Sequence, residues 1–212
     1  MTRIMEKDER AIEQQAAVSP VFPLPVFLLA GGMQRLRIFE QKYVEMVANA
    51  NQTDGFVISV YQKGQPFSTS DWGSHVRIVD FNQGEDGMLT IDVLADSLVS
   101  LDGFEYGDSG LLMAETSKIP HWSSVRDASD PDSDQWVENE GYQSQFSRIL
   151  KQIFAENDEL RNLYKIHHFD HAEWVSARLL EILPVPLHEK EKFVRQLNLL
   201  QLNQFLAGLC EA

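Results

Sequence analysis

The spacing of hydrophobic positions changes along the chain and divides it into two parts. Between residues 19 and 122 the apolar positions occur in short runs such as Phe56–Tyr61, which is rich in β-branched and aromatic side chains. In residues 88–93 apolar and polar side chains alternate, which predicts a half-buried strand, and the polar residues 83–87 before it predict a hairpin loop. Further strands are expected at residues 75–81, 97–101 and 111–116. Such short strands favour a mainly antiparallel sheet that closes on itself.

The start of this part carries its own signals. Pro23 and Pro25 interrupt the first apolar run, and proline cannot donate a hydrogen bond to a neighbouring strand, so this run predicts an edge or entry strand. Gly31 and Gly32 permit a sharp reversal after it. One helix is expected at residues 40–50, with an acidic side chain in its first turn and an apolar stripe along one side.

The second part of the chain has a helical period. Residues 127–140 are acidic and contain Pro131, which predicts a loop or linker that cannot build a core. Beyond it, apolar residues recur at helical spacing, and Asp170 is expected to be the N-cap of the third of four helices. These helices are predicted at residues 142–154, 157–166, 170–183 and 188–209. Four amphipathic helices joined by short turns indicate a helical bundle.

Composition narrows the possible partners and compartment. The 212 residues are 43% hydrophobic, which is enough to bury a core. The net charge of −14 argues against nucleic acid as a partner, because the phosphate backbone is also negative. A single cysteine, Cys210, excludes an internal disulfide, and no apolar run is long enough to span a membrane. We therefore expect a cytoplasmic protein.

The motifs of catalysis are missing from the sequence. There is no glycine-rich phosphate loop with its lysine, and no serine nucleophile elbow. His167 and His171 are four residues apart and could share one side of a helix, with His168 between them, but no third metal ligand is near in sequence. The paired carboxylates, such as Asp130 and Asp132, are expected in solvated loops. We expect no catalytic residue, no cofactor and no metal site.

Two aromatic side chains stand out in a polar stretch. Residues 62–73 contain proline and glycine and also hold Phe67 and Trp72. Large apolar side chains on a loop suit adaptable contacts with extended peptides. The competing interpretation is that both rings pack back onto the sheet. We predict that Phe67 and Trp72 form a peptide-binding site.

The order of elements and several short motifs match a known family. Residues 21–43 contain an apolar strand, a glycine turn, a short strand and a helix, with a leucine-proline pair and a leucine-rich helix near the other end of the chain. The matching residues are Phe22, Pro23, Leu24, Gly32, Ile38, Phe39, Glu40, Tyr43, Leu183 and Pro184. Over residues 19–209 the chain resembles the Lon amino-terminal domain family, the substrate-recognition module of the ATP-dependent Lon proteases, which also occurs as a stand-alone bacterial protein.

The resemblance implies both a fold and a function. The expected fold is α+β: a PUA-like antiparallel pseudo-barrel over residues 19–122, preceded by an arm at residues 1–18 and followed by an acidic linker and helical bundle at residues 123–212. The implied function is non-catalytic binding of unfolded or degron-bearing polypeptides in protein quality control, with a protease or chaperone machine as a further partner. The alternatives are a PUA-like RNA-binding protein and a metal-dependent hydrolase that uses the histidines.

Overall fold

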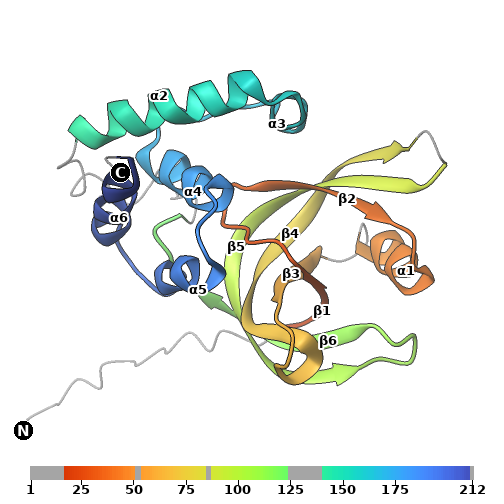
Figure 1. Ribbon diagram of the computed structural model, residues 1–212. Coiled ribbons are helices and arrows are strands. Elements are labelled where there is room, and N and C mark those ends of the chain that lie inside the picture. Colours follow the sequence, from red (N-terminus) through yellow and green to blue (C-terminus); the bar gives the residue numbers. More distant parts are fainter. Residues whose placement is uncertain (1–16, 51–53, 85–86, 124–139, 211–212) are drawn as a thin grey trace, which may run out of the picture.

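The computed structural model describes residues 17–50, 54–84, 87–123 and 140–210 (Figure 1). Six strands form one sheet in the order β2-β5-β4-β3-β1-β6, and an additional pairing of β5 with β6 closes it into a barrel. The strands are β1 (Ala17–Leu24), β2 (Met33–Ile38), β3 (Phe56–Tyr61), β4 (Thr69–Gln83), β5 (Leu89–Tyr106) and β6 (Leu112–Ile119). The predicted α+β class, with a closed sheet and C-terminal helices, is confirmed.

The first strand explains how a barrel wall accommodates prolines. Residues Ala17–Val21 of β1 pair with β6 in antiparallel fashion, and residues Val21–Leu24 pair with β3 in parallel fashion. The strand therefore lies between two neighbours and is the first strand of the barrel, so of the expected edge or entry strand the edge alternative is wrong. Each half still has only one partner, so Pro20 and Pro23 each lie where one side of the strand is unpaired, which is where proline is tolerated.

The longest strand, β5, joins two segments that the sequence predicts as separate strands. It pairs with β2, β4 and β6, and its two ends lead into the β4–β5 and β5–β6 hairpins. Asp92, near its start, is more buried than alternation predicts, and its carboxylate accepts two hydrogen bonds of 2.6 Å from the guanidinium of Arg35 on β2. This ion pair fixes β2 against β5.

The helices gather mostly on one side of the barrel, with α1 on the other side (Figure 1). The helical elements are α1 (Gln41–Ala50), η1 (Pro66–Ser68), α2 (Glu140–Glu156), α3 (Asp158–Leu163), α4 (Ala172–Ile182), α5 (Leu187–Lys190), η3 (Glu191–Phe193) and α6 (Leu200–Cys210). Glu40 precedes α1, and its carbonyl oxygen accepts the amide hydrogen of Val44, so it lies just outside the first turn in which we expected it. No described helix is long and apolar enough to cross a membrane.

Two helix predictions are wrong in detail. The helix expected at residues 188–209 is divided into α5, η3 and α6, and Asn198 ends the interruption because its side-chain oxygen accepts the amide hydrogen of Leu200. The N-cap of α4 is His171 and not Asp170, and it caps without a side-chain hydrogen bond. The predicted arm at residues 1–16 and the acidic segment at residues 124–139 lie outside the described residues.

One hydrophobic cluster extends from the barrel into the helices. It includes Leu29, Trp72 and Trp122 from the first part of the chain together with Phe146 and Leu180 from the helices, and all five are buried. Burial of such side chains on both sides of a contact is a main source of folding free energy. The helices therefore complete the core on one side of the barrel.

Candidate functional site

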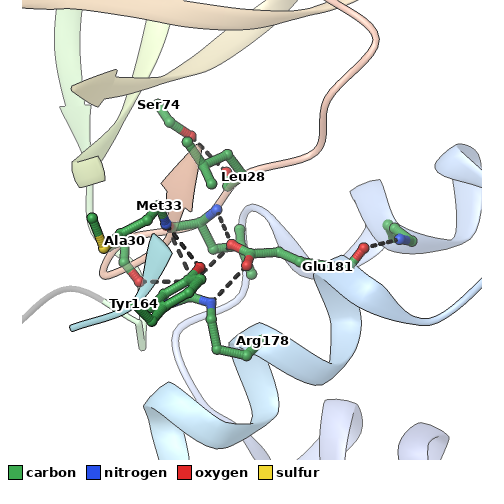
Figure 2. A network of polar contacts seen from close by, with 9 residues as sticks. Leu28, Ala30, Met33, Ser74, Tyr164, Arg178 and Glu181 are labelled. Carbon is green, nitrogen blue, oxygen red and sulfur yellow. Dashed lines mark hydrogen bonds and ion pairs between the residues drawn. The ribbon is translucent and has the colours of Figure 1, made fainter. Parts of the chain in front are cut away.

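A buried polar network joins helix α4 to the loop between β1 and β2 (Figure 2). Glu181 accepts hydrogen bonds from the Leu29 amide at 2.6 Å and from the Arg178 Nε and Nη2 atoms at 2.6 and 2.7 Å. Arg178 is fully buried, and its Nη2 atom also donates to the carbonyl oxygens of Leu29 and Ala30. The hydroxyl oxygen of Tyr164 accepts the Met33 amide hydrogen at 2.8 Å. Tyr164 is the C-cap of α3, so this bond connects the start of β2 to the end of α3.

This network has a structural role, which is to hold α4 against the loop between β1 and β2. Burial raises the pKa of the Glu181 carboxyl, and the Arg178 guanidinium opposes that change by favouring the charged form. Burial also raises the pKa of Tyr164 to about 12, so its hydroxyl stays protonated at neutral pH. A Cβ atom at Gly32 would lie 2.7 Å from Glu181 Oε1, so the predicted glycine turn is also required for the helix to approach. We name these contacts the junction network.

A groove of about 510 Å³ lies between the connection from β3 to β4 and residues 191–195. Glu191 Oε1 accepts hydrogen bonds from Gln62 Nε2 at 2.6 Å and from Trp72 Nε1 at 3.2 Å. Asp71 forms an ion pair with Arg195 at 3.0 Å. These contacts hold the barrel and the C-terminal segment together along the groove, which we name the aromatic groove. Its lining residues include Gln65, Pro66, Trp72, Phe104 and Val194.

Three aromatic rings cluster at one edge of this groove. The ring of Phe67 stacks on that of Phe104, with centroids 5.3 Å apart, and lies 5.8 Å from that of Tyr106. Phe67 is 38% exposed and Tyr106 is 62% exposed, so the cluster presents apolar surface to solvent. Phe67 and Ser68 both have a φ of 55°, a left-handed backbone conformation that residues other than glycine rarely adopt. Such strained positions often occur where a side chain is held for function.

The two predicted site residues lie in different environments. Trp72 belongs to β4 and is only 4% exposed, with its ring 5.5 Å from Phe27 in an edge-on contact. The expectation that Trp72 is a solvated loop residue is therefore wrong, because β4 begins at Thr69 and directs this side chain into the shared core. Phe67 has the expected exposed position. The role of both residues in peptide binding stays a prediction.

Sequence reasoning missed the other two members of the aromatic cluster. Phe104 and Tyr106 are two residues apart near the end of β5, and residues at that spacing share one face of a strand. The alternation was visible in the sequence. The sequence did not indicate that the turn holding Phe67 packs against Phe104 and Tyr106.

The other candidate residues form no site in the part of the chain that the structure describes. His167 stacks on Phe169, and His168 lies edge-on to Trp174, so these rings pack with aromatic neighbours. Within the described ranges, no three histidine, cysteine or acidic side chains lie close enough together to hold a metal ion. The acidic residues Asp130 and Asp132 lie outside those ranges.

A second groove, of about 480 Å³, lies beside the junction network, and we name it the junction groove. Its walls are mostly apolar and come from the loop after β1, the end of β3 and helices α3–α5. Its lining includes the apolar residues Val26, Phe27, Val185 and Leu187 and the charged residues Glu181 and Lys190. The two grooves share no lining residue, although Lys190 of this groove is adjacent in sequence to Glu191 of the aromatic groove.

Comparisons with known proteins agree with this architecture. Residues 18–201 match the family model of the ATP-dependent protease La (LON) substrate-binding domain. A crystal structure of a Lon N-terminal domain protein from Xanthomonas campestris is 26% identical, with a TM-score of 0.64, and the match covers 90% of this chain and 98% of that one.

A second solved structure has a similar fold. The N-terminal domain of the Mycobacterium avium complex Lon protease is 10% identical, with a TM-score of 0.59 and coverage of 90% and 96%, which supports the fold alone. No curated protein matches the chain significantly. Because the family model spans most of the sequence and the fold agrees with it, the chain belongs to the family of Lon substrate-binding domains.

Proposed function

We propose that this protein is a non-catalytic module that binds unfolded or degron-bearing polypeptides, with the aromatic groove as its contact surface. The observation that carries the proposal is the exposed cluster of Phe67, Phe104 and Tyr106 beside an open groove. Aromatic side chains often dominate binding energy because they supply large apolar area at a small cost in conformational entropy.

The surroundings of the cluster suit a polypeptide ligand. The groove also offers polar groups, including Gln65 and the ion pair of Asp71 with Arg195, which can hydrogen-bond to an extended backbone. The family match supports the same ligand class, since its model describes a substrate-binding domain. On this proposal the protein serves protein quality control in the cytoplasm and presents clients to a separate protease or chaperone machine.

The test is a binding measurement with fluorescein-labelled β-casein, an unfolded protein, followed by fluorescence anisotropy. The double variant Phe67→Ala/Tyr106→Ala should weaken binding by about 2 kcal/mol, or roughly 30-fold, as expected for aromatic anchors. The matched control is Phe81→Ala, because Phe81 is also exposed but lies on the β4–β5 hairpin at the opposite end of β5. Equal losses in both variants, or none in the double variant, would contradict the proposed surface.

Catalysis is tested separately. Purified protein should hydrolyse neither ATP nor casein above a buffer control. An activity that stays with the protein through every purification step would contradict the non-catalytic assignment, whatever the binding data show.

A further inference from the structure

The junction groove contains a buried ammonium group, that of Lys190, which forms no ion pair with a carboxylate of the described residues. Lys190 is only 7% exposed, and its Nζ atom donates one hydrogen bond, of 2.8 Å, to the backbone oxygen of Glu181. The same atom lies 5.7 Å from the centre of the Phe27 ring, which is part of the groove wall. Among the described residues, no carboxylate forms an ion pair with Lys190.

Arg178, Glu181 and Lys190 are linked by hydrogen bonds and together carry one more positive than negative charge. The Glu181 carboxylate is occupied by two hydrogen bonds from Arg178 and one from the Leu29 amide. An ammonium group has three donors, and Lys190 uses one of them within the described protein. Burial lowers the pKa of the Lys190 amine, with only the charge of Glu181 opposing that change. A buried charge is usually paired, so this one is suited to an anionic ligand.

We infer that the junction groove binds the C-terminal end of an extended polypeptide, with its terminal carboxylate on Lys190 and an apolar last side chain against the groove wall. The apolar wall is supplied by Val26, Phe27, Val185 and Leu187. This site is separate from the aromatic groove, so the inference does not depend on the function proposed there.

The backbone beside the groove favours a polypeptide over a simple fatty acid. No hydrogen bond joins the backbone of Val26 or Phe27 to any other described residue. Their amide and carbonyl groups lie in the loop that follows β1, beside the groove, and can hydrogen-bond to the backbone of a second chain. A fatty acid has no backbone groups to make these hydrogen bonds.

Lys190 also has a structural role, which the test must separate from binding. Its bond to the Glu181 carbonyl satisfies an acceptor in the last turn of α4, where a cation also favours the helix dipole. Lys190→Gln keeps a hydrogen-bond donor for that carbonyl and removes the charge. Lys190→Arg keeps the charge and serves as the rescue variant.

The experiment uses two short fluorescein-labelled peptides of the same sequence, glycine- and serine-rich and ending in two leucines, one with a free carboxylate and one with a terminal carboxamide. Full-length protein should bind the carboxylate form about tenfold more tightly, since a hydrogen bond to a charged group contributes at least that much. Lys190→Gln should bind both forms equally, and Lys190→Arg should retain the preference. Phe67→Ala should also retain it.

Several results would overturn the inference. These are equal binding of the two peptides by the unaltered protein, no binding of either, or a preference that survives in Lys190→Gln. If Phe67→Ala bound neither peptide, both peptides would be assigned to the aromatic groove. That result would support the proposed function and would contradict a carboxylate site in the junction groove. Lys190-dependent binding of octanoate without binding of the peptides would assign the groove to a free carboxylic acid.

Discussion

His121 makes the stability of this protein depend on pH. It follows β6, is only 7% exposed, and its Nδ1 atom accepts the Ser123 amide at 3.1 Å. The Nε2 atom is 2.9 Å from the carbonyl oxygen of Phe193, which can only accept, so Nε2 carries the hydrogen of the neutral ring. A second proton on Nδ1 would break the hydrogen bond from the Ser123 amide and would have only Ser123 Oγ, 2.6 Å away, as an acceptor, while burial of the ring disfavours the added charge. The folded state therefore holds His121 neutral.

The size of this pH effect on the free energy of unfolding follows from the shift in the pKa of His121. Burial lowers the pKa of His121 from 6.5 to about 4, and the hydrogen bond to Phe193 only partly opposes this. Between these two values the unfolded chain binds the proton and the folded chain does not, so the free energy of unfolding falls as the pH falls. At 1.36 kcal/mol per unit, the loss between pH 6.5 and pH 4 is about 3 kcal/mol.

Urea unfolding across this pH range measures the loss directly, with His121→Gln as the comparison because glutamine does not titrate. The burial-raised pKa of Glu181 has the opposite sign, since it lowers stability as the pH rises through it, but both proteins share that contribution. The difference between the two proteins should therefore shrink steadily from pH 6.5 towards pH 4. Parallel pH profiles for the two proteins would refute the reasoning.

Three further predictions concern the core, the junction and the acidic segment. Trp72→Ala should lower the free energy of unfolding by about 3–5 kcal/mol in urea unfolding, because the ring is buried; a loss under about 1 kcal/mol would contradict its placement. Arg178→Met should cost about 3–5 kcal/mol by leaving Glu181 unpaired, and adding Glu181→Leu should restore most of it; no recovery would argue against the pairing. A Glu-specific protease should cut first within residues 127–140, whereas first cuts between residues 40 and 115 would place the boundary elsewhere.

Local spacing predicted most of the elements but not how far each one extends. The alternation in residues 88–93 and the β-branched run of Phe56–Tyr61 correspond to parts of β5 and to β3. The continuation of β5 to Tyr106 was not visible, because Ala95 and Asp96 interrupt the apolar pattern while pairing with three other strands fixes the backbone. The prediction of one helix over residues 188–209 is wrong because the side chain of Asn198 caps the start of a new helix, and the spacing of apolar residues does not reveal such a cap.

The candidate site was predictable only where exposure follows from a local turn. Phe67 is exposed in such a turn, whereas Trp72 is buried by helices from the far end of the chain. The junction groove was not foreseen at all, since Phe27 and Lys190 meet only after the helices pack on the barrel. Interactions between distant segments carry no signal in the spacing of a single sequence.

The junction network also sets an order of events during synthesis. Leu29 and Glu181 are 152 residues apart, and the buried amide of Leu29 has its partner only after α4 has been made. At about 5–20 residues per second, the ribosome needs roughly 8–30 s to add those residues. During that interval the nascent barrel exposes the side of its core that the helices later cover, which makes this stage of synthesis the one in which the chain itself most resembles an unfolded client.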